Sequence, residues 1–134
     1  MTDKIIISRL LEFEQISSNV ISKDKIDKYK NQGVKEINHY LRDMNKISYQ
    51  ELGDKENVGR VLYFINHPDK INPIMIDNFC GSGMPSGEAN ITDGTHRLSA
   101  AIYLEWKTID AEYSGLEETL DYLTGKINKN LFVD

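Results

Sequence analysis

The sequence predicts a single α+β domain built from amphipathic helices and a few short strands. The chain has 134 residues, of which 40% are apolar, and this is enough to bury one core but not two. Apolar residues recur at helical spacing within residues 37–44 and 58–65. Short apolar or alternating segments at 73–77, 88–92 and 107–113 are typical of strands.

Composition narrows the classes of protein that the chain can represent. The longest apolar runs, Ile5–Ile7 and Leu62–Ile65, are far shorter than the roughly 20 residues that span a membrane. The first residues also lack the long apolar stretch and the small-residue cleavage site of a signal peptide. We therefore expect a cytoplasmic protein with no membrane partner. The net charge of −5 disfavours a broad DNA-binding surface, because non-specific DNA affinity comes from basic residues that neutralise phosphates.

Metal and redox sites built from cysteine or histidine have little support. Cys80 is the only cysteine, which excludes an internal disulfide and a zinc site of several thiolates. His39, His67 and His96 share no metal-ligand spacing.

The N-terminal third, residues 1–45, is predicted to be a helical extension. Lys4 to Ile16 favours a first helix, although the isoleucine run at its start also suits a short strand. Ser22 is a helix-starting residue, and Gly33 interrupts the helix that follows. A second apolar face is predicted from Ile37, Tyr40, Leu41 and Met44.

Helices and strands then alternate along the chain. A helix begins near Asp54 to Asn57 and ends at His67-Pro68, because the residue before proline is disfavoured in the α conformation. The last helix carries apolar residues from Leu116 to Ile127. The predicted strands are Ile47–Tyr49, Pro73–Asp77, Glu88–Thr92 and Lys107–Tyr113, with a long glycine-rich loop, Phe79–Gly87, between the second and the third.

The candidate functional segment is the turn Asp93-Gly94-Thr95-His96-Arg97, which joins a strand to a helix. Gly94 permits a tight turn, and the free N–H groups of a first helical turn favour an anion. Arg97 opposes the helix dipole in this position, but its guanidinium suits a phosphate or carboxylate. An equally good interpretation is that Asp93 or Thr95 caps the helix while Arg97 points into water.

The segments around this turn resemble the ParB/sulfiredoxin-like superfamily. The shared features are an apolar strand after Pro73, a strand that ends in the Asp93–Arg97 turn, a helix that contains alanine, and a further strand after Trp106. The resemblance extends from about residue 46 to residue 113. It implies an α+β fold in which flanking helices cover a small mixed sheet, and residues 46–134 would hold this core and a C-terminal helix within one domain.

The resemblance also implies a ligand. In that superfamily the turn is similar to a nucleotide-phosphate cradle, so Gly94, Thr95, His96 and Arg97 are expected to bind phosphate. Members include ParB-type CTP-binding switches, sulfiredoxins, free serine kinases and nucleases, so what they share is a pocket rather than a reaction. Sulfiredoxins carry their catalytic cysteine where this chain has Thr95, which argues against sulfiredoxin chemistry.

The resulting functional hypothesis is a nucleotide-binding protein, with hydrolysis or phosphoryl transfer from a nucleoside triphosphate as the candidate reaction. Asp93 and His96 are the catalytic candidates, and Asp93 is also the candidate ligand for Mg²⁺. Further acidic candidates are Asp54, Glu56 and Asp77.

Other residues have weaker support as parts of the site. Asn57 and Arg60 can reach a phosphate, but a solvated helix face is the preferred interpretation. Tyr103, Trp106 and Tyr113 can stack on a base, yet aromatic residues near a strand are more often core.

Two alternative functions stay open at this point. One is a non-enzymatic regulator from a mobile element, which binds a host protein through its N-terminal helices. The other is a DNA nuclease, which the net negative charge of the chain disfavours.

Overall fold

The structure, a computed structural model, describes residues 2–38, 53–79 and 88–129. Its strands are β1 (Asp3–Ile6), β2 (Ile74–Asp77), β3 (Asn90–Asp93) and β4 (Thr108–Ser114). Its helices are α1 (Ile7–Leu10), α2 (Glu14–Ser17), α3 (Lys23–Asn31), α4 (Gly53–Asn66), the 3-10 helix η3 (Pro68–Lys70), α5 (Thr95–Tyr103) and α6 (Glu117–Thr124). The predicted α+β class is confirmed. Over the described ranges, no helix combines the length and the apolar character needed to cross a membrane.

The four strands form one mixed sheet in the order β1-β4-β2-β3. β1 is antiparallel to β4, β4 is parallel to β2, and β2 is antiparallel to β3. The antiparallel pairing brings the end of β3 beside the start of β2, with Asp93 opposite Met75. The turn that follows β3 therefore lies next to the chain that leads into β2.

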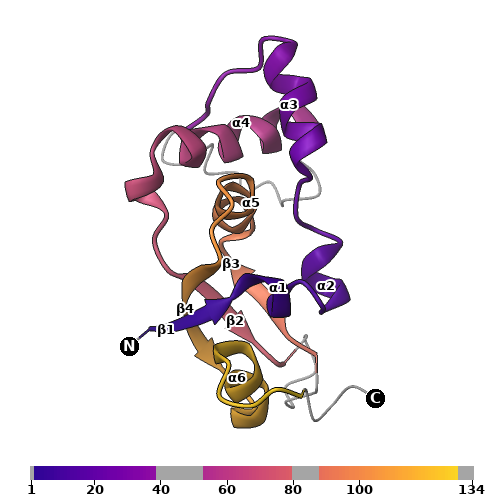
Figure 1. The fold of residues 1–134 in the computed structure, drawn as a ribbon. Helices are drawn as coiled ribbons and strands as arrows, with labels where there is room; N and C mark the ends of the chain where they lie inside the picture. The colour runs from indigo at the N-terminus through magenta and orange to yellow at the C-terminus, as the bar shows by residue number, and fades with distance from the viewer. Residues whose placement is uncertain (1, 39–52, 80–87, 130–134) are drawn as a thin grey trace.

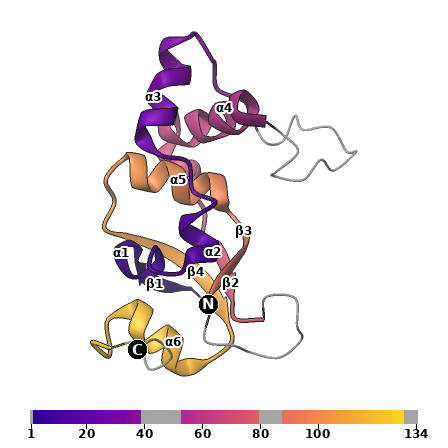
Figure 2. The same cartoon turned by 90° about the vertical axis from the view of Figure 1, so that its right-hand side faces the viewer.

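α5 lies between the sheet and the pair formed by α3 and α4 (Figures 1 and 2). Leu98 and Ala101 of α5 belong to the core on the sheet, which also contains Ile74 of β2. Ala100, on another side of α5, packs with residues of α3 and α4, among them Ile26. α5 is therefore the element that joins the two parts of the core.

The N-terminal segment differs from the preferred prediction. Residues Asp3–Ile6 form the edge strand β1 rather than the start of a helix, and only two short helices follow before Ser18. Ile5 is fully buried and lies opposite Ile109 of β4. The prediction of one helix from Lys4 to Ile16 is thus wrong, and the strand alternative for the isoleucine run is confirmed for its first two residues. Pairing with β4 and the strand preference of β-branched residues override the helical spacing.

The predicted features of α3 are confirmed. The Ser22 hydroxyl accepts a hydrogen bond from the Lys25 backbone N–H at 3.2 Å. Gly33 has a φ of +93° just after the helix. No helix follows directly within the described residues, since Ile37 lies in irregular chain and donates its N–H to the Gly59 carbonyl at 2.8 Å. Tyr40, Leu41, Met44 and the predicted strand Ile47–Tyr49 lie outside the described residues, as does Cys80.

For the remaining predicted helices and strands, most of the predicted first and last residues lie within one or two residues of the observed ones. α4 stops at Asn66, immediately before His67-Pro68, as predicted. β2, β3 and β4 coincide with three predicted strands. α6 ends at Thr124, because Gly125 adopts a left-handed conformation with φ +89°, so Ile127 lies beyond the helix that was expected to include it.

Candidate functional site

The turn between β3 and α5 has the backbone geometry that only glycine accepts readily. Gly94 has φ +111° and ψ +18° and forms the N-cap of α5. A Cβ atom at this position would lie 2.5 Å from the Ile74 Cγ2 and 2.8 Å from the Ile74 Cβ. Gly94 is therefore required twice, once for its φ angle and once for the close approach of the turn to β2.

The first turn of α5 has no side-chain cap among the described residues. Asp93, one of the two residues considered for this role, instead forms an ion pair with Arg97, with 3.0 Å between Oδ2 and Nη2. Thr95 is half-buried as the first residue of the helix. The capping interpretation is thus wrong, and the N-terminal N–H groups of α5 keep the partial positive charge that attracts anions.

Arg97 does not point into water, because its side chain is 15% exposed. Its Nη1 donates to the Pro73 carbonyl at 2.8 Å and to the Asn72 carbonyl at 3.2 Å. Together with the Asp93 ion pair, these bonds tie the start of α5 to the chain that enters β2. Arg97 therefore fixes the shape of the turn, in addition to any contact with a ligand.

His96 is buried and lies against α4. Its Nε2 is 2.8 Å from the Asn57 Oδ1. Since an amide oxygen can only accept, Nε2 is the donor in this bond. The bond places a proton on Nε2 and holds α5 against α4, so His96 has a positioning role whether or not it transfers a proton.

A pocket of about 270 Å³ opens in front of this turn. The turn and α5 contribute Asp93, Gly94, His96 and Arg97, and the other lining residues are Tyr63, Phe64, Lys70 and Asn72. Four of the five predicted site residues thus line one pocket, and Thr95 starts the helix beside it. Lys70 has no carboxylate within ion-pair distance in the described part of the chain, so the pocket has a positive side.

The lining residues contributed by α4, η3 and the start of β2 were not predicted. Lys70 and Asn72 precede β2 directly, and the antiparallel pairing of β2 with β3 brings them to the Asp93–Arg97 turn. Tyr63 and Phe64 come from the last turns of α4, where Tyr63 also packs against His67, with 4.6 Å between ring centroids. The predicted strand after Pro73 could have identified Lys70 and Asn72. Residues just before a strand lie beside the end of the neighbouring strand when the two strands are antiparallel.

The other acidic candidates do not reach this pocket. Asp54 lies at the start of α4, where its Oδ1 is 3.4 Å from the Lys25 Nζ. Glu56 is 3.5 Å from an Arg60 nitrogen, and Asp77 accepts a hydrogen bond from the Phe79 backbone N–H at the far end of β2. Among the described residues, Asp93 is therefore the only carboxylate that lines the pocket.

The prediction that Asn57 and Arg60 lie on a solvated face of α4 is wrong. Asn57 is 6% exposed and Arg60 is 1% exposed. The Asn57 side chain is turned toward His96, and Arg60 belongs to the largest fully buried side chains. Packing of α4 on α5 explains the burial of Asn57, because a polar residue on the contact face is enclosed regardless of its hydropathy.

The three aromatic candidates lie outside the pocket lining. Trp106 is one of two large apolar side chains that are markedly exposed among the described residues, at 37%. Tyr103 donates to the Asp27 carboxylate at 2.6 Å, and this bond, followed by burial, raises the pKa of the phenol. The hydrogen bond to Asp27 thus gives Tyr103 a structural role that requires no ligand.

Tyr113 belongs to a polar network at the C-terminal end of β4. Its hydroxyl donates to the Leu116 carbonyl at 2.6 Å and contacts Oδ1 of Asn78, which is fully buried. Burial raises the pKa of Tyr113 to about 12. This network links β4 to the start of α6, away from the pocket in front of α5.

The chain matches no protein-family model, no curated protein and no solved structure. The functional conclusion therefore depends on the geometry of the site and on the sequence pattern.

Proposed function

We propose that the protein binds a nucleotide through its phosphate at the N-terminal turn of α5, in an α+β arrangement of the ParB/sulfiredoxin-like kind. One observation carries this proposal: the start of α5, which no described side chain caps, opens into a pocket that also holds the Lys70 side chain. A helix N-terminus beside a cation is an electrostatic environment that favours a phosphate.

In this proposal the phosphate accepts hydrogen bonds from the backbone N–H groups of Thr95 and His96 and an ion pair from Lys70. Arg97 fixes the turn through the bonds of its Nη1 to two carbonyls. Its Nη2 contacts both Asp93 and the phosphate in this proposal. Gly94 keeps the backbone close to β2 and leaves room for the ligand in front of the turn.

The walls of the pocket suit an aromatic ligand attached to the phosphate. Tyr63 and Phe64 line it and meet edge to face, with 5.3 Å between ring centroids. The volume of about 270 Å³ is at the small end of the range for ligand pockets. We expect the phosphate and sugar to occupy the pocket and the base to contact Tyr63 at its mouth.

In this proposal Mg²⁺ binds together with the nucleotide. No group of three or more His, Cys, Asp or Glu side chains suited to a metal occurs in the described ranges. Asp93 alone therefore offers one ligand, and Mg²⁺ would complete its coordination with phosphate oxygens and water. Asp93 fits this role because it is 68% exposed, although Mg²⁺ would compete with Arg97 for its carboxylate.

Binding has stronger support than turnover. Hydrolysis or phosphoryl transfer needs a group that activates or orients the attacking oxygen. The Nε2 of His96 is already used in the bond to Asn57, and the carboxylate of Asp93 is paired with Arg97. The reaction is thus the second step to test, after binding.

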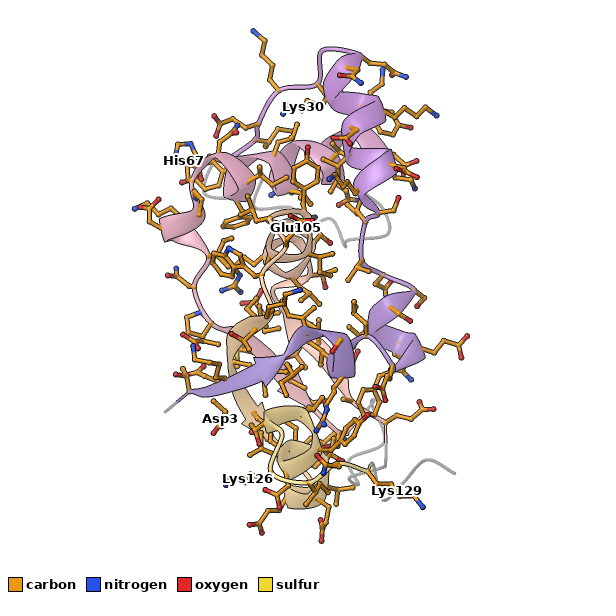
Figure 3. All side chains as sticks on the ribbon, in the orientation of Figure 1. Asp3, Lys30, His67, Glu105, Lys126 and Lys129 are labelled. Carbon is orange, nitrogen blue, oxygen red and sulfur yellow. The ribbon has the colours of Figure 1, made fainter. Side chains whose placement is uncertain are left out.

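The test is a thermal-shift panel of nucleoside mono-, di- and triphosphates, each with and without Mg²⁺. A ligand that binds only the folded state stabilises it by about 2.7 kcal/mol at one hundred times its Kd. We expect a raised Tm for the wild type, a much smaller shift for Lys70→Gln, and a full shift for Lys30→Gln. Lys30 is a matched control because it is exposed on α3, which contributes no residue to the pocket lining (Figure 3).

Two results would overturn the proposal: no nucleotide shifts the wild type, or Lys70→Gln responds like Lys30→Gln. Phosphate release with the best-binding triphosphate, with and without Mg²⁺, then decides whether the bound nucleotide is turned over.

A further inference from the structure

The ring of Tyr63, which lines the phosphate pocket, packs against a second ring at the end of α4. The ring centroids of Tyr63 and His67 lie 4.6 Å apart, with an angle of 34° between the ring planes. His67 directly follows the last residue of α4 (Figure 3), and its backbone N–H donates to the Tyr63 carbonyl at 2.9 Å. The two rings therefore lie one helical turn apart on the same side of α4.

His67 is itself held by Glu36, which belongs to the irregular chain after α3. The His67 Nε2 lies 2.8 Å from the Glu36 Oε2, between residues that are 31 positions apart in the chain. Since a carboxylate oxygen only accepts, Nε2 is the donor in this bond. The bond fixes the orientation of the imidazole ring that packs on Tyr63.

Gly59 allows the segment that carries Glu36 to lie on this side of α4. The Ile37 backbone N–H donates to the Gly59 carbonyl at 2.8 Å, and a Cβ at Gly59 would lie 2.7 Å from the Ile37 Cδ1. So close an approach requires glycine. Gly59, Tyr63 and His67 are spaced by four residues and share one face of the helix. The chain beside Glu36 is thus anchored on the face of α4 that carries both rings.

We infer that Glu36 and His67 are positioning residues that fix the Tyr63 ring for contact with the base of the ligand. They thereby make the site prefer a nucleotide to a sugar phosphate that has no base. This inference rests on the proposed function, because it assigns the selection of a ligand at the same pocket. Neither Glu36 nor His67 is among the described residues that line the pocket, so both act through Tyr63 rather than on the ligand.

The physical reason is preorganisation. A side chain that is already held in place loses less conformational freedom when a ligand binds, so less of the binding energy is lost. The pair contributes little to the fold itself, because the His67 and Glu36 side chains are 43% and 38% exposed and exposed pairs stabilise proteins only weakly. We therefore expect its removal to change ligand selection rather than stability.

Isothermal titration with ribose 5-phosphate and with AMP, GMP, CMP and UMP tests this inference. The base preference is defined as the Kd of ribose 5-phosphate divided by the Kd of the tightest-binding nucleotide. Stacking of a base on an aromatic side chain gives the wild type an expected base preference of about tenfold or more. Glu36→Ala and His67→Ala are expected to lower it by about two- to tenfold, the effect of freeing one side chain, and to keep the wild-type affinity for ribose 5-phosphate.

Two further variants are matched controls. Glu36→Gln keeps an oxygen that accepts the bond from His67, so it is expected to retain most of the base preference. Asp110→Ala removes one partner of another exposed pair, in which the Lys4 Nζ lies 3.4 Å from the Asp110 Oδ1, and neither residue lines the pocket. This variant is expected to behave like the wild type. Each of these variants is expected to keep the wild-type Tm to within a few degrees.

The outcomes separate this inference from the proposed function. If the wild type binds a nucleotide but Glu36→Ala and His67→Ala keep its base preference, the inference fails and the phosphate site at the α5 turn stands. The inference also fails if both variants lose affinity for ribose 5-phosphate and nucleotide alike, or if the wild type shows no base preference. If the wild type binds no nucleotide, both the inference and the proposed function fail.

Discussion

Gly94→Ala is the substitution for which the structure gives the most definite expectation. The new Cβ would meet the Ile74 Cγ2 at 2.5 Å and the Arg97 Nη2 at 3.1 Å, on a backbone with φ +111°. Real Cβ contacts essentially never fall below 3.0 Å, so either the turn or β2 must move. Ile74 is fully buried in the core on the sheet and cannot easily give way.

Gly94→Ala lowers the free energy of unfolding for two reasons. Holding a non-glycine residue at such a φ costs about 1–3 kcal/mol, and forcing an extra methyl group into a packed region costs about 1–3 kcal/mol more. We expect Gly94→Ala to lower the free energy of unfolding by about 2–6 kcal/mol, a large part of the roughly 5–15 kcal/mol that stabilises a domain.

Gly33→Ala is the matched control, since Gly33 has φ +93° but no atom lies within 4 Å of the position that a new Cβ would take. That change is expected to cost only the conformational part, about 1–3 kcal/mol. Urea unfolding of both variants, with unchanged m-values, measures the difference. Equal losses of stability would refute the close contact between the turn and Ile74, and with it the geometry proposed for the phosphate site.

The remaining predictions concern β1 and the Tyr113 network. Ile5→Ala is expected to cost about 2–5 kcal/mol in urea unfolding, because Ile5 is fully buried, whereas Lys4→Ala on the exposed face of β1 is expected to change stability by less than about 1 kcal/mol; equal effects would contradict the assignment of β1. The pKa of Tyr113, about 12, lies above its unfolded value near 10. The stabilisation is therefore complete below about pH 10 and is lost as pH rises toward 12. Burial is only partial, so this loss amounts to about 1–2 kcal/mol. Tyr113→Phe is expected to unfold with a weaker pH dependence over that interval, and an unchanged pH dependence would refute the role of Tyr113.

The sequence predicted the turn and its neighbours well because the signals there are local. Glycine at a strand-to-helix junction, an apolar strand before it and an amphipathic helix after it depend on residues that are close in the chain. Gly94 and the start of α5 were found in this way. The prediction that Ser22 starts α3 succeeded for the same reason, since a cap contacts a residue only three positions away.

The features that the sequence did not predict depend on contacts between distant segments. Ile5 lies in a strand because it pairs with Ile109, at the other end of the chain. Lys70 lies in the pocket because β2 pairs with β3. Arg60 of α4 is buried although its side chain is charged. Hydrophobic spacing cannot identify a buried arginine, since its hydropathy predicts a solvated position.

Two polar side chains of α4, Asn57 and Arg60, are buried in different ways. Asn57 lies against the start of α5, where helix packing alone would favour an apolar residue, and Arg60 is buried on the same helix. Buried polar groups persist when they are fully hydrogen-bonded, or when a function requires their cost. The Asn57–His96 pair is hydrogen-bonded, whereas Arg60 lacks partners for two of its nitrogens within the described ranges. The bond between Asn57 and His96 therefore compensates the burial of one polar side chain of α4, whereas the burial of Arg60 has no comparable compensation in the described part of the chain.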